Sequence, residues 1–502
     1  MSSVVIKRCG LILSTCAVFC LTLTGCGGDH PVRSYLQKLG LVYPDEYLED
    51  SAGSDRTGTL PGIWSAQEDT GSESGTADSK EASTTVYQEE TPVDEHAVNG
   101  DVDDLIGRLR QEAGLDEWRS SDDSGASHHI DAEVDSTDTL YSDAAAQRAR
   151  NAIGLTTAGI REVRAQQTGL YAYEHLNDDG QKLYAELYTI LTERAEDIII
   201  STMDEQVLDT VFHFLMADHP EIFYVDGYRY TRYMRGDKLL KIGFTGNYNC
   251  SASVQAARQV RIDEAAEEWL EGAPSGDDYE IARYIYETVI NRTEYDVDAA
   301  DSQNITSVLM YGRSVCQGYA RATQYLLNRC RVEATLVTGE VGGVGHAWVL
   351  ALIDGSYTYI DTTWGDASYQ LAQVGAGENT KLPMINYSYL CVTTQELART
   401  HDITDSIPQP SCTDMSVNYY VRENEYFTSY DTARVGELFE RRYGDGSNNV
   451  TIKCSTGDVY DALVDSLIRK QEVFGYLHGE NDSFAYSLLE DQYTIIIWLS
   501  RG

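Results

Sequence analysis

Apolar and polar positions follow regular periods along the chain from about residue 154 onward. Apolar residues spaced three or four positions apart predict amphipathic helices, and short runs rich in β-branched and aromatic residues predict strands. Helices are expected over residues 176–191, 207–215, 252–270, 277–293 and 316–330. Strands are expected over residues 222–225, 228–233, 238–244, 346–353, 357–363 and 386–392. Both element types therefore share the folded part of the chain.

Cys316 stands at the start of one predicted helix. Apolar or small residues follow it at helical intervals, and Ser314 lies just ahead of it as a possible cap. A helix N-terminus stabilises an anion through its dipole and its unpaired N–H groups, so it lowers the pKa of a thiol placed there. The position of Cys316 is therefore typical of a nucleophilic cysteine.

His346 and Asp361 fall on a predicted hairpin. Residues 346–353 and 357–363 flank Asp354-Gly355, which is a strong two-residue turn signal. With that turn His346 and Asp361 lie on the same face as diagonal neighbours, about 7–8 Å apart at the backbone. A register slip of one residue would place them on opposite faces. A thiol, an imidazole and a carboxylate can then form a nucleophile, its base and the group that orients the base.

Three ordered sequence motifs carry a family resemblance. They are Val-Cys-Gln-Gly-Tyr-Ala from Val315, Gly-His-Ala-Trp from Gly345, and Asp-Thr-Thr-Trp from Asp361. The stretch resembles the core of the transglutaminase-like superfamily of papain-type thiol enzymes. The close resemblance covers residues 303–366, and a looser one covers residues 150–502. Val349 departs from the family pattern, because bacterial members frequently have Asn after His-Ala-Trp.

The resemblance implies an α+β fold, in which the helix bearing Cys316 packs on an antiparallel sheet bearing His346 and Asp361. It also implies that Cys316 is the nucleophile, His346 the general base and Asp361 its orienting partner. Gln303 matches a position that often stabilises the oxyanion in relatives. Residues 151–275 resemble the helical preface of many bacterial members and are interpreted as scaffold. The resemblance therefore supplies both a fold and a set of roles.

The N-terminus has the pattern of an export signal. Lys7 and Arg8 precede an apolar run over residues 10–23, which is short of the about 20 apolar residues that a membrane helix needs. Cys26 directly follows Leu-Thr-Gly, which resembles a bacterial lipobox, so Cys26 is expected to be lipidated. An ordinary signal peptide is the alternative. The protein is thus expected to be exported, anchored to the cell membrane by lipid, and facing outside.

Residues 26–150 are predicted to form an acidic, disordered tether. Ser, Thr, Asp, Glu and Gly dominate this segment and apolar periodicity is nearly absent, so it cannot bury enough surface to offset its ordering entropy. The pair His128-His129 within it is interpreted as solvated sequence rather than a metal site. The predicted organisation is a lipoprotein signal peptide (1–25), the tether (26–150), the preface (151–275), the catalytic core (276–405) and a C-terminal unit (406–502).

The C-terminal unit is predicted to be a small α+β domain. Its expected strands are 419–422, 426–427, 450–453 and 493–499, and its expected helices are 430–441 and 459–471. It is either a substrate-binding or wall-binding module or a domain that completes the core.

Two histidines outside this unit are interpreted as structural residues. His219 caps or packs at a helix end, and His401 is a surface or loop residue.

Charge and cysteine usage exclude several classes of protein. A formal net charge of −42 without a basic stripe excludes a nucleic-acid-binding protein. No C-x-x-C pair or His/Cys cluster has zinc spacing, so neither a metal nor another cofactor is predicted. The cysteines left after the signal, Cys26 and Cys316 form an odd, widely spaced set, which argues against a fully paired disulfide framework. They are Cys250, Cys330, Cys391, Cys412 and Cys454.

The sequence leaves two classes of function open. The first is an exported thiol enzyme that attacks peptide or carboxamide bonds and forms a thioester, with a protein or peptide substrate that includes cell-wall peptide among its candidates. Water as the second nucleophile gives a protease or amidase, and a lysine amine gives a transglutaminase; hydrolysis is the favoured reading. The second class is a non-catalytic surface adaptor that uses the fold for binding, since a fold alone does not fix a function.

Overall fold

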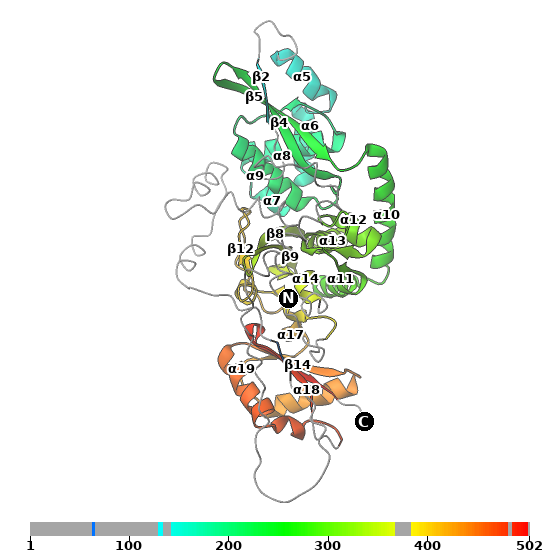
Figure 1. Cartoon of the computed structure of the whole chain (residues 1–502), viewed down its shortest axis with the longest axis vertical. Coiled ribbons are helices and arrows are strands. Elements are labelled where there is room, and N and C mark those ends of the chain that lie inside the picture. The colour runs from blue at the N-terminus through cyan, green and yellow to red at the C-terminus, as the bar shows by residue number, and fades with distance from the viewer. Residues whose placement is uncertain (1–62, 66–128, 134–141, 367–382, 480–483, 500–502) are drawn as a thin grey trace, which may run out of the picture.

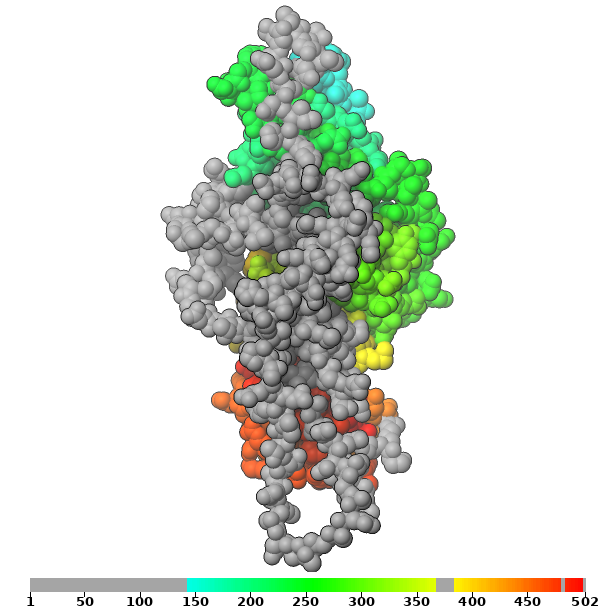
Figure 2. Space-filling view, in the orientation of Figure 1, coloured from blue at the N-terminus to red at the C-terminus, as the bar shows by residue number. Residues whose placement is uncertain are grey.

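The computed structural model describes residues 63–65, 129–133, 142–366, 383–479 and 484–499. The predicted signal peptide, Cys26 and most of the predicted tether lie outside these residues. The described chain forms an N-terminal part, a central part and a C-terminal part, which follow one another along the long axis (Figure 1). The space-filling view gives the same order (Figure 2). Within the described ranges, no helix combines the length and the apolar character needed to cross a bilayer.

The N-terminal part packs helices on a sheet of order β2-β4-β5-β3. The strands are β2 (His129–Glu133), β3 (Ile198–Ile199), β4 (Val225–Arg235) and β5 (Lys238–Tyr248). The helices are α5 (Asp143–Ala152), α6 (Thr157–Gln167), α7 (Tyr171–Glu174), α8 (Asp178–Glu193) and α9 (Glu205–Asp218). Helix α8 begins where Asn177 accepts a hydrogen bond from Gly180 N, and it buries Leu183, Leu187 and Ile190.

Two expectations for this part differ from the structure. Helix α5 begins at Asp143 and strand β2 at His129, so ordered elements occur inside the segment 26–150 that was predicted to be a disordered tether. The predicted strand over 222–225 begins only at Val225, because Ile222 N bonds back to His219 O in a turn. His219 ends α9 and bonds Gln167 and Glu221, which confirms its packing role.

The central part contains an antiparallel sheet of order β11-β10-β9-β8-β12. Its strands are β8 (Ala334–Val341), β9 (Val344–Ile353), β10 (Ser356–Ile360), β11 (Leu390–Val392) and β12 (Asp402–Ile403). The helices around it are α10 (Ala252–Leu270), α11 (Asp278–Arg292), α12 (Ile305–Tyr311), α13 (Cys316–Arg329), α14 (Thr362–Gly365) and α16 (Thr394–Leu397). A short parallel pair joins β6 (Glu294–Tyr295) to β7 (Arg313–Ser314). Helix α13 packs on β8 and β9.

The β9–β10 hairpin has the predicted turn and register. Ile353 pairs with Ser356, and Asp354 and Gly355 both take positive φ, at 50° and 83°. This conformation is the one that Asp-Gly favours in a two-residue hairpin loop. The second strand is shorter than predicted, since β10 ends at Ile360 and Asp361 caps α14. The predicted strand over 386–392 likewise begins with a 3₁₀ turn, η4 (Tyr387–Tyr389).

The C-terminal part has its own core around a sheet of order β1-β15-β16-β14-β13. The strands are β1 (Ile63–Ser65), β13 (Tyr426–Phe427), β14 (Asn449–Cys454), β15 (Tyr486–Leu489) and β16 (Thr494–Trp498). Helix α17 (Tyr419–Arg422) precedes this part, whose own helices are α18 (Thr432–Gly444), α19 (Gly457–Val464), the π-helical turn η5 (Asp465–Arg469) and the 3₁₀ turns η6 (Glu472–Gly475) and η7 (Glu490–Gln492). The predicted strand over 419–422 is wrong: it is helix α17, which Asn418 caps by accepting from Tyr420 N.

The hydrophobic cores do not follow the predicted boundaries at 275 and 405. One cluster of buried residues runs from Leu155 to Tyr420, so preface and catalytic core share it. Ile407, Cys412 and Val417 belong to this cluster rather than to the C-terminal part. The second cluster begins at Phe427. The C-terminal part is therefore smaller than predicted.

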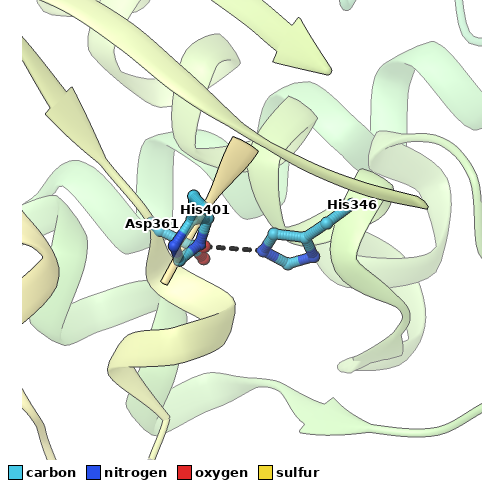
Figure 3. A group of neighbouring side chains, drawn as sticks. All are labelled: His346, Asp361 and His401. Atoms are coloured by element: carbon cyan, nitrogen blue, oxygen red, sulfur yellow. Dashed lines mark hydrogen bonds and ion pairs between the residues drawn. The ribbon is translucent and has the colours of Figure 1, made fainter. Parts of the chain in front are cut away.

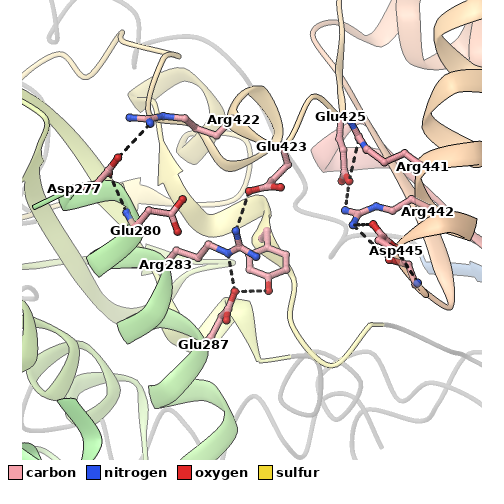
Figure 4. A network of polar contacts seen from close by, with 12 residues as sticks. Asp277, Glu280, Arg283, Glu287, Arg422, Glu423, Glu425, Arg441, Arg442 and Asp445 are labelled. Carbon is pink, nitrogen blue, oxygen red and sulfur yellow. Dashed lines mark hydrogen bonds and ion pairs between the residues drawn. The ribbon is translucent and has the colours of Figure 1, made fainter. Parts of the chain in front are cut away.

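Ion pairs lie at the junction of the central and C-terminal parts (Figure 4). Arg283 of α11 bonds Glu287 and Glu423, each at 2.9 Å, and Arg442 of α18 bonds the buried Glu425. A cavity of about 270 Å³ at this junction is bordered by Arg283 and Arg442. None of the predicted catalytic residues borders it, so it is separate from the site described next.

Candidate active site

Cys316 is the first residue of α13, as the sequence predicted. The capping expectation differs: Val315 occupies the N-cap position and makes no side-chain cap in the described structure. Ser314 instead bonds Ser307 Oγ at 2.6 Å and Ser302 O at 3.0 Å. The dipole of a helix favours an anion at its N-terminus, which for α13 is the end that carries Cys316.

Gly318 allows the loop before α12 to pack closely against the start of α13. A Cβ built on Gly318 would lie 1.9 Å from Ser314 Oγ and 2.8 Å from Ser302 O. Only a residue without a side chain therefore fits between the helix and this loop. Gln303 directly follows Ser302, which brings it to the same end of α13. Its role toward an oxyanion stays a prediction.

The environment of Cys316 is mostly apolar. Its side chain is buried, at 2% exposure, and packs against the partly buried Tyr295, Val297 and Val344. Val344 begins β9, two residues before His346. The thiol therefore lies between the start of α13 and the start of the strand that carries His346.

His346 and Asp361 meet as the hairpin geometry predicted. His346 Nε2 lies 2.6 Å from Asp361 Oδ2, and both side chains are buried (Figure 3). The last paired residues are Ile360 and Val349, so Asp361 is the next position along the strand. Its N–H bonds Tyr389 O at 2.9 Å, which fixes the backbone at this point. With Nε2 engaged by Asp361, Nδ1 is the ring nitrogen of His346 left for Cys316, whose proximity helps to raise the pKa of His346.

The two oxygens of Asp361 have different partners. Oδ1 accepts from Thr363 N at 2.8 Å and Trp364 N at 3.0 Å, which makes Asp361 the N-cap of α14. Oδ2 accepts from His346 and also from His401, whose Nε2 lies 2.9 Å away. The carboxylate is thus held at both of its oxygens.

His401 is the residue of this cluster that the sequence did not identify. It was predicted to be a surface or loop histidine, but it is buried, at 2% exposure. It comes to the site because β12, directly after it, pairs with β8 at Gly339, and Gly339 also pairs with His346. Gly339 permits this approach, because a Cβ there would lie 2.2 Å from Asp402 O. No sequence spacing reveals a contact that depends on sheet order.

Burial and charge pairing set the protonation of the cluster. Burial lowers the pKa of His346, but Asp361 and Cys316 outweigh it and raise the pKa to about 10. Burial raises the pKa of Asp361, yet His346 and His401 hold it well below its ordinary value. For His401 burial dominates over Asp361, so its pKa is lowered. At neutral pH the cluster therefore contains a charged His346, an ionised Asp361 and a neutral His401.

His346, Asp361 and His401 also bring possible metal ligands together. Their possible ligand atoms all lie within 4.8 Å of one another. Both imidazoles, however, hydrogen-bond the same carboxylate oxygen directly, at 2.6 and 2.9 Å. The arrangement therefore fits a hydrogen-bonded cluster rather than a metal centre.

Cys26, the predicted lipidation site, lies outside the described residues.

Six cysteines of the described residues are free thiols in the structure. They are Cys250, Cys316, Cys330, Cys391, Cys412 and Cys454. Burial raises the pKa of Cys391, Cys412 and Cys454, and also of the half-buried Cys330. These thiols are therefore poor nucleophiles, because the thiolate is the reactive form.

Comparisons with known proteins match the segment that carries these residues. Residues 267–362 match the model of the transglutaminase-like superfamily. The kyphoscoliosis peptidase of Mus musculus is 28% identical over 134 residues, which are 23% of this chain and 20% of the relative. That of Homo sapiens is 26% identical over 128 residues, 22% of this chain and 19% of the relative. This chain thus spans about a fifth of the length of these relatives.

Among solved structures, the crystal structure of a TGase aligns with 28% of this chain and 44% of its own, at 15% identity and a TM-score of 0.21. The matched residues 267–362 contain Cys316, His346 and Asp361, and they end before His401. The segment from residue 267 to residue 362 is a domain of the transglutaminase-like superfamily, which includes cysteine peptidases and transglutaminases.

Proposed function

We propose that this chain is an exported, membrane-anchored thiol enzyme that acts on peptide or carboxamide bonds through Cys316, His346 and Asp361. The observation that carries the proposal is the buried His346–Asp361 pair, with Nε2 and Oδ2 2.6 Å apart, beside a cysteine at the first position of α13. Burial with a specific charge partner is how proteins prepare a base for catalysis. The raised pKa of His346 favours an imidazolium beside the thiol, and an imidazolium favours a thiolate.

The reaction follows from these protonation states. The Cys316 thiolate attacks the carbonyl carbon, and the tetrahedral intermediate expels ammonia or an amine, which takes the proton of His346. A thioester on Cys316 remains. Water then attacks the thioester while His346 accepts its proton, and the carboxylic acid leaves as the thiolate and imidazolium are restored. Asp361 stays ionised throughout and keeps the imidazole oriented.

The oxyanion formed in both steps needs donors close to Cys316. The N–H groups at the start of α13 are proposed as such donors, and the dipole of α13 favours negative charge at this end. Gln303 is proposed as a further donor, because the loop that carries it is fixed against the same end of the helix.

Water as the acceptor makes the enzyme a protease or amidase, and a lysine amine makes it a transglutaminase. We favour hydrolysis, and the curated relatives named peptidases support this choice. The proposed partner is a protein or peptide, with cell-wall peptide among the candidates. The apolar Tyr295, Val297 and Val344 around Cys316 favour an apolar group next to the scissile bond.

The first test is the pH dependence of Cys316 alkylation by iodoacetamide, followed by mass spectrometry of the Cys316 peptide. We expect a rate that stays high well below pH 8.5, the pKa of a free thiol, and that falls about tenfold or more at pH 6 in a His346→Ala variant. Cys330 in the same sample is an internal control, because its raised pKa should keep its alkylation slow at this pH. A rate at Cys316 that follows free-thiol behaviour and ignores His346 would reject the enzyme and favour the surface adaptor.

A peptide library in H₂¹⁸O with an added primary amine distinguishes the two reactions. Incorporation of ¹⁸O into a new carboxyl group identifies hydrolysis, and an amine adduct identifies transfer. A Cys316→Ala variant is the control for both products.

Export and lipid anchoring through Cys26 rest on the sequence pattern of the N-terminus. Expression of the full chain with an alkyne-bearing fatty acid tests them. We expect label on the wild-type chain in the membrane fraction and loss of label in a Cys26→Ser variant. Equal labelling of both chains would reject Cys26 as the lipidation site.

A further inference from the structure

We propose that His401 is a positioning residue of this site: it donates a hydrogen bond to Asp361 and keeps that carboxylate directed at His346. The inference rests on the proposed function of Cys316, His346 and Asp361. His401 lies outside the matched segment 267–362, so the family match assigns it no role.

The contact geometry shows what His401 restrains. Both imidazoles bond Oδ2 of Asp361, His346 at 2.6 Å and His401 at 2.9 Å; Figure 3 shows the three residues together. Oδ1 is already held by the amides of Thr363 and Trp364. A carboxylate held at one oxygen can still turn about its last side-chain bond. The bond from His401 to Oδ2 opposes this rotation, so it preserves the short contact with His346.

The partners of His401 define its tautomer. An ionised carboxylate only accepts, so Nε2 of His401 carries the proton. Its Nδ1 lies 2.7 Å from Thr400 Oγ1 and accepts from that hydroxyl. The network continues outward, since Tyr389 OH lies 3.4 Å from Thr400 Oγ1 and accepts from Gln492 Nε2 at 2.6 Å. Every donor in this network points toward Asp361, and Gln492 brings in the C-terminal part.

The surroundings of His401 suit a neutral donor. Its ring packs against Trp348, Trp364 and Tyr389, with ring centroids 5.1 to 5.5 Å away. Burial among these rings lowers the pKa of His401. A neutral imidazole restrains Asp361 without cancelling its charge, whereas an Arg or Lys there would compete with His346 for it. The titratable groups that face the cluster are Cys316, Tyr286, His346, Tyr389 and Asp402.

The test is the alkylation profile of Cys316 in the full chain with iodoacetamide, for wild type, His401→Phe and His401→Gln. Phe fills the site without a donor, whereas the Gln amide restores one. A hydrogen bond to a charged group is equivalent to about one pKa unit or more. We therefore expect the midpoint of the rate–pH curve to rise by about one unit in His401→Phe, with about tenfold slower alkylation at pH 6. His401→Gln should recover most of this loss.

His213→Phe is the matched control. His213 also bonds a buried aspartate, with Nε2 2.9 Å from Asp405 Oδ1, but it lies on α9 outside the site. The His213→Phe substitution should lower the thermal stability without changing the pH dependence of Cys316 alkylation. A folded His401→Phe protein whose profile matches wild type would overturn the inference.

If His401→Phe does not fold, His401→Gln and Thr400→Val take its place. Thr400→Val removes the hydroxyl that fixes the tautomer, so the midpoint should move upward by a smaller amount. No shift in Thr400→Val would overturn the inference. The outcomes also separate the two proposals: a free-thiol profile in wild type rejects both, whereas an activated wild type with unshifted His401 and Thr400 variants rejects the role of His401 alone.

Discussion

At the scale of single residues, Asp361 connects the chemistry of the site to the fold. One oxygen caps α14 through the amides of Thr363 and Trp364, and the other accepts from two imidazoles. Its ion pair with His346 has a defined pH window. The folded-state pKa of His346, about 10, lies above the unfolded value of about 6.5. The stabilisation is therefore fully present below about pH 6.5 and is lost as the pH rises through about 10.

The prediction from this pair concerns Asp361→Asn. Removing one partner of a buried ion pair costs about 3–5 kcal/mol, and urea unfolding at pH 7 should show a loss of this order. The loss should shrink at pH 10.5, where the stabilisation of the wild type has faded. Alkylation of Cys316 at pH 6 should fall about 100-fold, at the lower end of general acid–base contributions.

Asp361→Ala is the companion variant. Asn keeps an oxygen that can cap α14, whereas Ala loses it at a further cost of about 1 kcal/mol. A destabilisation of Asp361→Asn that stays the same at pH 7 and pH 10.5 would contradict the assigned ion pair.

At the scale of elements, local signals predicted the hairpin and the helix that carry the site. Asp354-Gly355 fixed the register of β9 and β10 because a two-residue loop with positive φ matches the twist of the strands. The periodicity after Cys316 fixed the start of α13. Both features depend on residues close together in the sequence.

Elements ended differently from expectation where side chains capped the backbone. Thr362 and Thr363 have high strand propensity, yet they belong to α14 because Asp361 accepts from the first amides. Tyr419 and Tyr420 also favour strands by propensity, but Asn418 caps α17. Ser314 was expected to cap α13 and instead bonds Ser302 and Ser307. A side chain that caps the backbone can start a helix where strand propensity is high. Which of the two structures forms depends on the burial of the segment.

At the scale of the whole molecule, a buried pair ties the N-terminal part to the central sheet. His213 on α9 bonds Asp405, and Asp405 also accepts from the amide and hydroxyl of Thr338 on β8. Burial lowers the pKa of His213, but Asp405 outweighs it and raises that pKa. Burial raises the pKa of Asp405, but His213 and the hydrogen bonds hold it low. This pair connects residues far apart in the sequence through one shared core.

The prediction is that His213→Phe lowers the free energy of unfolding by about 1.5–3 kcal/mol at pH 5.5. The contribution of a histidine with a raised pKa is fully present below about pH 6.5 and is lost as the pH rises through its folded value. The difference between wild type and variant should therefore be smaller at pH 9.5. Urea unfolding at both pH values measures it, and a larger difference at pH 9.5 would contradict the assignment.

The sequence by itself determined the features that depend on neighbouring residues. Cys316 at a helix start, His346 and Asp361 on one face of a hairpin, and the resemblance to a thiol-enzyme core all follow from local periodicity, turn residues and short motifs. Tertiary structure decided the rest. His401 reaches Asp361 because β12 joins the sheet beside β8, and Gln492 reaches Tyr389 because the C-terminal part packs there. Such contacts depend on how the chain returns to itself over tens of residues, and sequence spacing does not record that path.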